Sequence, residues 1–303
     1  MTNTPRPKRV ANEISIVLRT VFGNDRFPVN VSEVAREISA QKFPDDPLTM
    51  IKGADLPGFE GALTPAPPGK RGWGIIYNNT QSPGRINFTL GHEFGHYLLH
   101  RLHYPEGFQC STEDMAGWDS EYGQLEYQAN DFAATLLMPL DDFRTQIQVS
   151  ERADFDVLGA CATRYDVSLI AAILRWLQFT TRRSVLVVSR DGFILWARSS
   201  KAALKSGLYY KTRGRPPIPV PEGSLAARRR DIGNSMASEY HDTPQWLKES
   251  CHEHVLFSDQ YYFTLSLLHF GDALNRGASI DEEPFEDAFE HMQRVNPGSS
   301  WLD

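Results

Sequence analysis

The sequence predicts an α+β fold, with a helix-rich N-terminal part and a C-terminal part that begins with β structure. In the first half, apolar residues recur at helical spacing, as in residues 125–138, where the pattern stops at Pro139. After Thr180 apolar and polar residues alternate around Asp191-Gly192, which is a good signal for a β-hairpin. This change of period predicts a domain boundary near Thr180.

The expected elements follow in order along the chain. Helices are expected over 9–22, 28–40, 85–101 and 125–138, and short strands over 59–65 and 72–79. Two helical segments fill 155–179 around a break near 164–168, and a late strand covers 260–270 before an acidic helix or loose tail over 281–294. We therefore expect three parts: residues 1–150, a helical connecting segment 151–180, and a C-terminal domain 181–303.

Composition limits the class of protein. A hydrophobic content of 41% and a charged content of 23% are ordinary for a globular protein. The most apolar run, residues 168–179, is broken by Arg175 and is too short to span a membrane. The N-terminus lacks the apolar core of a secretory signal, and the three cysteines are widely spaced. We expect a reduced, cytoplasmic chain with no membrane partner.

The net charge of −7 is unevenly distributed. Residues 182–230 contain twelve Lys or Arg against two acidic residues, whereas residues 231–303 contain fourteen acidic residues against three Lys or Arg. Such blocks can bind nucleic acid or an acidic partner, or they can neutralise each other within one domain. We favour neutralisation because the blocks are adjacent and nearly cancel, so DNA binding is open but not favoured.

The stretch FTLGHEFGHYLLH, residues 88–100, carries the clearest chemistry. His92 and His96 are four residues apart, so on a helix both imidazoles lie on one face and can bind one tetrahedral Zn²⁺. Glu93 lies about 100° around the helix from His92, where its carboxylate can take a proton from a zinc-activated water. The alternative is a solvated helix face without metal. Apolar neighbours favour a buried position, where three unpartnered polar groups would be costly.

A catalytic zinc needs a third protein ligand. The segment EYQANDFAATLLMP places Glu126, Ala129, Asn130 and Ala133 on one helical face. The small side chains of Ala129 and Ala133 allow close approach to the first helix, so Glu126 can meet the two histidines. Glu121 is a rival in a less regular stretch, and a first-turn acid favoured by the helix dipole is the structural alternative. We prefer Glu126 as the ligand.

Two blocks of the sequence together resemble a known family. RINFTLGHEFGHYLLH followed by EYQANDFAATLLMP resembles the ImmA/IrrE family of zinc metallo-endopeptidases, which show an R..FTLAHELGHxLLH block and then an E..AN.FAA.LLMP block. The match extends upstream to PVNV and to the strand that ends in Asn78. The resemblance implies a small gluzincin-like metalloprotease core. In it His92, His96 and Glu126 would bind zinc, with manganese as the alternative metal, and Glu93 would be the general base.

The resemblance also implies a partner and further domains. Members of this family typically cleave or otherwise inactivate a helix-turn-helix repressor of the Xre type, which derepresses DNA-damage genes, a mobile element or a toxin–antitoxin system. Residues 157–177 resemble the helix-turn-helix-like segment of radiation-response members, although two packing helices explain the pattern equally well. The C-terminal part weakly resembles the GAF-like sensor domain of those members.

Two further expectations concern the substrate. In gluzincin-like cores an edge strand pairs with the extended substrate backbone. We assign this role to WGIIYNN, in which Ile75 and Tyr77 face one side and would contact substrate; an ordinary core strand is the alternative. The transition-state oxyanion needs a donor besides zinc, and the sequence does not select among Tyr97, His100, Arg101, His103 and Tyr127.

The sequence therefore predicts a cytoplasmic zinc-dependent endopeptidase that cleaves an Xre-type repressor and carries a C-terminal regulatory domain. One alternative is a non-proteolytic regulatory protein that binds a transcription factor or DNA and uses its metal structurally. Another is a toxin–antitoxin component.

Overall fold

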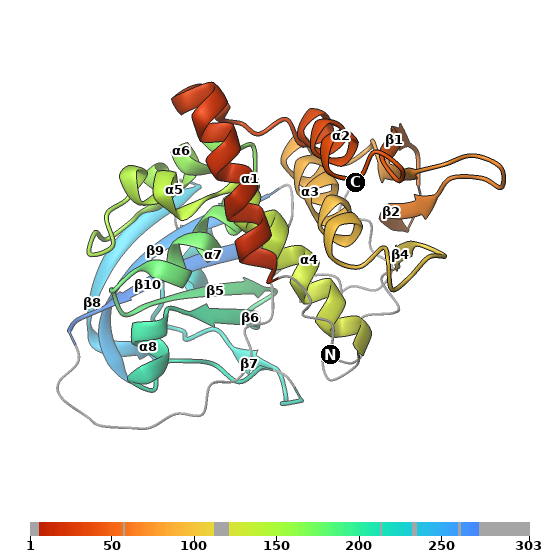
Figure 1. The fold of residues 1–303 in the computed structure, drawn as a ribbon. Coiled ribbons are helices and arrows are strands. Elements are labelled where there is room, and N and C mark those ends of the chain that lie inside the picture. Colours follow the sequence, from red (N-terminus) through yellow and green to blue (C-terminus); the bar gives the residue numbers. More distant parts are fainter. Residues whose placement is uncertain are drawn as a thin grey trace. The chain divides into compact units, whose positions relative to one another are not determined.

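The computed structural model describes residues 6–56, 58–111, 121–212, 214–231, 235–259 and 262–272. These residues form two compact units, one with residues up to 143 and 161–171, the other with 144–160 and residues from 172 onward. Both units combine helices with a β-sheet, so the expected α+β class is confirmed (Figure 1). The three sequence ranges expected as domains remain a prediction, and the acidic segment 281–294 lies outside the described residues.

The first unit packs helices against a small sheet. Its helices are α1 (Pro7–Phe22), the 3-10 turn η1 (Gly23–Arg26), α2 (Val31–Lys42), α3 (Pro83–Leu99) and α4 (Glu121–Leu137). Its strands are β1 (Leu48–Ala54), β2 (Phe59–Pro65), β3 (Trp73–Asn78) and β4 (Phe108–Ser111). The strands lie in the order β1-β3-β2-β4, with β1 parallel to β3 and the other pairs antiparallel. The strands β2 and β3 were predicted; β1 and β4 were not.

Helix α3 is the central element of this unit. It packs against β2, β3 and α4, and Figure 1 shows it running alongside α2 next to the sheet. Pro83 suits its first turn, where a missing N–H costs nothing. The helix is buried along most of its length, including His92, Glu93 and His96. Polar side chains this deep in a protein need partners or a bound ion.

Small residues let α3 and α4 approach closely. A Cβ atom on Gly95 would lie 3.2 Å from both Cα and the carbonyl oxygen of Ala129, and one on Gly91 would lie 3.2 Å from Cβ of Ala133. A larger side chain at any of these positions would push the helices apart. The close approach expected from Ala129 and Ala133 is therefore confirmed.

Three helices follow: α5 (Leu140–Gln146), α6 (Phe155–Tyr165) and α7 (Leu169–Phe179). The break between α6 and α7 falls where it was predicted, and Ser168 Oγ accepts a hydrogen bond of 3.2 Å from the N–H of Ala171, as a cap does. Among the described residues, no single helix has the length and apolarity to cross a membrane. Helices α6 and α7 have the necessary length and apolarity only when taken together, and this pair is bent by 107° at the break.

The second unit contains a six-stranded antiparallel sheet in the order β7-β6-β5-β10-β9-β8. Its strands are β5 (Ser184–Arg190), β6 (Phe193–Ser199), β7 (Ile218–Pro219), β8 (Met236–Trp246), β9 (Glu249–Ser258) and β10 (Phe263–Phe270), joined by α8 (Lys201–Lys205) and the 3-10 segment η2 (Ala226–Asp231). The hairpin predicted at Asp191-Gly192 joins β5 to β6, and both turn residues have positive φ, 50° and 81°. This matches the demands of a two-residue hairpin turn.

Arginines of the basic block pair with carboxylates of the acidic block inside this second unit. Arg183 Nη2 lies 2.8 Å from Glu249 Oε2, and the guanidinium groups of Arg228 and Arg229 pair with Glu239 and Asp259. The two blocks thus neutralise each other in part, as favoured from the sequence.

Candidate metal centre

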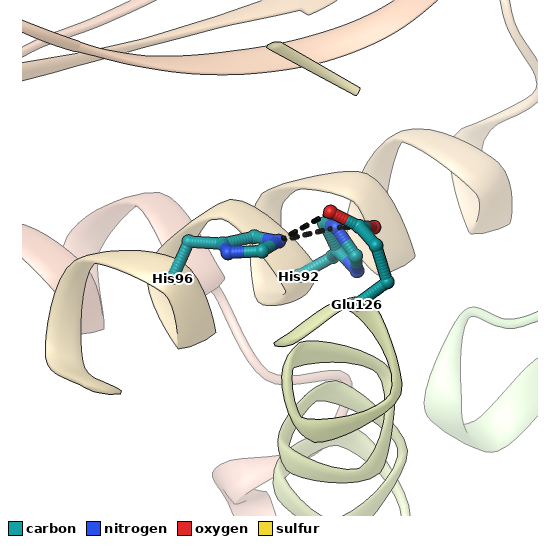
Figure 2. Close-up of side chains that lie close together, drawn as sticks. All are labelled: His92, His96 and Glu126. Atoms are coloured by element: carbon teal, nitrogen blue, oxygen red, sulfur yellow. Dashed lines mark hydrogen bonds and ion pairs between the residues drawn. The ribbon is translucent and has the colours of Figure 1, made fainter. Parts of the chain in front are cut away.

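Three buried side chains from α3 and α4 converge on one point. His92 Nε2 lies 3.1 Å from Glu126 Oε2, His96 Nε2 lies 3.2 Å from Glu126 Oε1, and the two Nε2 atoms are 3.0 Å apart. Figure 2 shows both imidazoles projecting from α3 and the carboxylate reaching them from α4. The structure thus brings together the three residues that the sequence predicts to bind metal.

The donor set fits a tetrahedral metal ion. Ligands at about 2.0–2.1 Å from zinc stand roughly 3.3 Å from one another in a tetrahedron, close to the three separations found here. Two imidazole nitrogens and a carboxylate oxygen are also ligands that zinc accepts. Within the part of the chain that the structure describes, only this cluster has three potential ligand atoms within 4.8 Å of one another.

The electrostatics of the cluster are those of a site built for a cation. Burial disfavours a charged imidazole at His92, but the Glu126 carboxylate outweighs it and raises the pKa of His92 to about 9. Burial, with charged His92 beside it, holds the pKa of His96 below its ordinary value. Burial opposes ionisation of Glu126 as well, yet the two histidines hold its pKa well below the ordinary value. A carboxylate kept ionised at this depth requires positive charge next to it.

The second ring nitrogen of each histidine also has a partner. His92 Nδ1 lies 2.8 Å from Oδ1 of Asn130, which is 2% exposed. His96 Nδ1 lies 3.1 Å from His100 Nδ1, and His100 Nε2 lies 3.3 Å from Oε1 of Gln128. Both amide side chains come from α4. The sequence placed Asn130 on the face of Glu126 but did not indicate this contact.

Glu93, the expected general base, is fully buried and lies against the backbone of β2. It is next to His92 in the chain and so lies beside the cluster of His92, His96 and Glu126, called the triad below. A Cβ atom on Gly61 would come within 2.9 Å of Glu93 Oε1 and 2.6 Å of Thr89 Cγ2. The carboxylate therefore occupies space that only a glycine at this position of β2 leaves open. The sequence did not single out Gly61, since nothing in the motif points to the opposing strand.

The expectation that β3 is an edge strand is wrong. β3 lies between β1 and β2, so its backbone groups are used on both sides and cannot pair with a substrate. Ile75 is 0% exposed. Tyr77 is half-buried, and its ring lies over Gly53 of β1. The substrate contacts expected from these two residues relied on an open edge that β3 does not have.

The edge next to the triad is formed by β4. Among the described strands of this sheet, β1 and β4 stand at the two ends, and β4 pairs with β2. The ring of Phe108 on β4 lies 4.3 Å from that of His96, centroid to centroid. No strand was expected here, because this part of the sequence is polar and contains glycine.

Several of the candidate oxyanion donors have side chains that are held by other groups. Tyr97 OH donates to the carbonyl oxygen of Asp46 at 2.7 Å, and Arg101 Nε donates to the Asp46 carboxylate at 3.0 Å. His100 bonds to His96, and burial with His96 beside it lowers the pKa of His100 to about 3, so that its ring is neutral. His103 is exposed and Tyr127 is half-buried.

A buried HExxH helix that supplies two histidines, and a close-packed second helix that supplies a glutamate, define a class of metal-dependent peptidases. Residues 51–177, which contain His92, Glu93, His96 and Glu126, match the model of the peptidase family M78, the IrrE N-terminal-like domain. This match to a metallopeptidase family of the IrrE/ImmA kind confirms the family resemblance read from the sequence. A search of curated proteins found no match to the chain.

Proposed function

We propose that the protein is a zinc-dependent endopeptidase that cleaves a helix-turn-helix repressor of the Xre type. The observation that carries this proposal is the convergence of His92, His96 and Glu126 beside the buried carboxylate of Glu93. The metallopeptidase family of residues 51–177 supports the class of reaction. The repressor as substrate is the part supported by family resemblance alone.

The chain's own residues would divide the chemistry as follows. His92, His96 and Glu126 would hold the zinc, which when bound supplies Lewis acidity that polarises a peptide carbonyl and acidifies water near neutral pH. Glu93 would take the proton of the attacking water on its carboxylate and pass it to the departing amide nitrogen. Gly61 of β2 leaves open the space that this carboxylate occupies. Manganese would serve the same ligands as an alternative to zinc.

We assign the substrate-binding edge to β4. An extended peptide would add through main-chain hydrogen bonds to the side of β4 that no described strand occupies. Since Phe108 of β4 packs on His96, a strand added there would run beside the metal site. A repressor segment would have to unfold locally to enter in this form.

We further propose roles for the rest of the chain. The pair α6 and α7 would act as the helix-turn-helix-like segment that resembles those of radiation-response members, contacting the repressor rather than DNA. The six-stranded sheet of the second unit would act as a regulatory, GAF-like sensor domain. The two buried cysteines, Cys161 and Cys251, are unpaired, as in a reduced compartment, and we propose that the protein acts in the cytoplasm.

The test is to incubate the purified protein with the Xre-type repressor encoded beside its gene, with Zn²⁺, with Mn²⁺ and with chelator. We expect a cut fragment with metal, none with chelator, and none from Glu93→Gln. Glu60→Gln removes a neighbouring carboxylate that pairs with Arg85 rather than with the triad, and it should still cleave.

Cleavage and binding separate this proposal from its alternatives. If wild type and Glu93→Gln leave the repressor intact and bind it equally well, the protein is a non-proteolytic regulator and the metal is structural. Should the neighbouring genes encode a toxin whose activity this protein controls without proteolysis, the toxin–antitoxin reading replaces ours.

A further inference from the structure

The ring of His92 is held at both nitrogens by groups from α4. Its Nε2 faces Glu126, and its Nδ1 lies 2.8 Å from Oδ1 of Asn130. Asn130 is 2% exposed, so this contact lies away from solvent. Glu126 and Asn130 are four residues apart on one helix and therefore share a face. The face that supplies the metal ligand also supplies an acceptor behind the first histidine.

This arrangement selects one tautomer of His92. A histidine that binds metal through Nε2 needs its lone pair there, and so the neutral ring must carry its proton on Nδ1. Amide oxygens only accept hydrogen bonds, and Asn130 Oδ1 is placed to accept that Nδ1–H. The opposite tautomer would set the Nδ1 lone pair against the Oδ1 lone pairs and would block Nε2 with a proton.

A parallel chain stands behind His96. Gln128 Oε1 is placed to accept a proton from His100 Nε2, which leaves His100 Nδ1 to accept from His96 Nδ1–H. The direction of hydrogen-bond donation is therefore the same behind both ligands. Each ligand histidine keeps its proton on Nδ1, and each series of hydrogen bonds ends at an amide oxygen of α4. Two separate series of hydrogen bonds with the same direction indicate that these contacts orient the metal ligands and do not arise from packing alone.

We propose that Asn130 is a positioning residue for the metal site, which fixes the orientation and the Nδ1–H tautomer of His92. Outer partners of this kind typically contribute a factor of about 10–100 in metal affinity. The inference deepens the metal site of the proposed function, yet it needs only that the triad binds a metal. It stands whether or not the repressor is the substrate.

The experiment measures Zn²⁺ affinity by competition with a chromophoric chelator and the visible absorption of the Co²⁺-loaded protein. Three variants are compared: Asn130→Asp, Asn130→Leu and Asn87→Ala. The control Asn87 is also a buried asparagine, and it bonds to the carbonyl oxygens of Tyr165 and Asp166 instead of to a ligand. Asn130→Leu keeps the approximate size and removes the acceptor, whereas Asn130→Asp keeps the acceptor.

We expect Asn130→Leu to weaken Zn²⁺ binding by about 10–100-fold and to alter the Co²⁺ spectrum. Asn130→Asp should restore both to near wild type, and Asn87→Ala should change only the melting temperature. Wild-type Zn²⁺ affinity in Asn130→Leu would overturn the proposal. So would an equal loss in Asn130→Asp, since that result means the amide acts as a donor or as filler.

Two outcomes keep this test separate from that of the proposed function. If Asn130→Leu does not fold, two other measurements test the proposal. The Zn²⁺ affinity of Asn130→Asp reports whether an acceptor is needed, and the ¹⁵N shifts of the wild-type His92 ring report its tautomer. A protein that binds Zn²⁺ as described but leaves every repressor intact refutes the protease proposal and leaves the role of Asn130 in place.

Discussion

Gly95 of α3 and Ala129 of α4 touch backbone to backbone. A Cβ atom on Gly95 would stand only 3.2 Å from Cα and from the carbonyl oxygen of Ala129, and 3.0 Å from the ring of Phe132. Ala129 is three residues from Glu126, and Gly95 directly precedes His96. The spacing of these two helices therefore sets the distance between the glutamate and the histidines.

Widening this contact should weaken the metal site as well as the fold. Gly95→Val forces the helices apart, and overpacking of this kind costs about 1–3 kcal/mol. We expect a lower free energy of unfolding together with weaker Zn²⁺ binding, measured by denaturation and by chelator competition. Gly159→Ala is the matched control, because no described atom from beyond its own turn of α6 lies within 4 Å of its Cβ position. It should stabilise the protein by up to about 1 kcal/mol. Unchanged Zn²⁺ affinity in Gly95→Val would disconnect the helix contact from the site.

Gly61 should matter for catalysis more than for metal binding. The three atoms nearest to a methyl group there belong to Thr89 and Glu93, with Glu93 Oε1 at 2.9 Å and Thr89 Cγ2 at 2.6 Å. We expect Gly61→Ala to lower kcat by at least about tenfold, since a small misplacement of a general base is costly, while the zinc content stays at the wild-type level. In Gly74→Ala on the neighbouring strand the methyl group meets the flexible end of Met50, and activity should persist. Full activity in Gly61→Ala would show that Glu93 tolerates displacement.

Acid should destabilise the second unit through His269. Its Nδ1 lies 2.9 Å from Ser184 Oγ and its Nε2 lies 2.9 Å from the carbonyl oxygen of Ala153. Burial, with His254 beside it, lowers the pKa of His269 from 6.5 to about 3. The folded state thus binds the proton less readily than the unfolded chain. The stability that comes from the neutral ring is fully present above pH 6.5 and is lost as the pH falls toward 3.

Replacing His269 should remove part of that dependence. We expect His269→Gln to show a shallower fall in unfolding free energy between pH 6.5 and 4 than the wild type, measured by urea denaturation at each pH. The slope should not vanish, since the pKa of His254 is also lowered, mainly by burial. Identical slopes in both proteins would assign the acid sensitivity to other groups.

The sequence predicted the centre of the first unit well because the signals there are local. Helical spacing alone puts His92 and His96 on one face, and alanines four residues apart, at 129 and 133, predict a close helix contact. The order of strands in the sheet is not local. The run WGIIYNN is compatible with an edge strand and with a central strand. Only its pairing with both β1 and β2 shows that it is central. The short strand β4 was missed since four residues in a polar segment carry almost no period.

The outer parts of the site show the same limit. Glu126 could be inferred because the chemistry required a third ligand and a helix offered one. The acceptor role of Asn130 and the space left by Gly61 depend on how α4 and β2 lie against α3. These are relationships between elements, and no pattern within a single element reports them.

We propose that His92, His96 and Glu126 hold a catalytic zinc beside Glu93. Zinc content after metal loading and dialysis, measured for wild type, Glu126→Ala and Glu93→Gln, tests it most directly. We predict one zinc per chain in the wild type and in Glu93→Gln, and affinity at least about a hundredfold weaker in Glu126→Ala, which lacks one of three protein ligands. Tight, stoichiometric zinc in Glu126→Ala, or its loss in Glu93→Gln, would contradict the account.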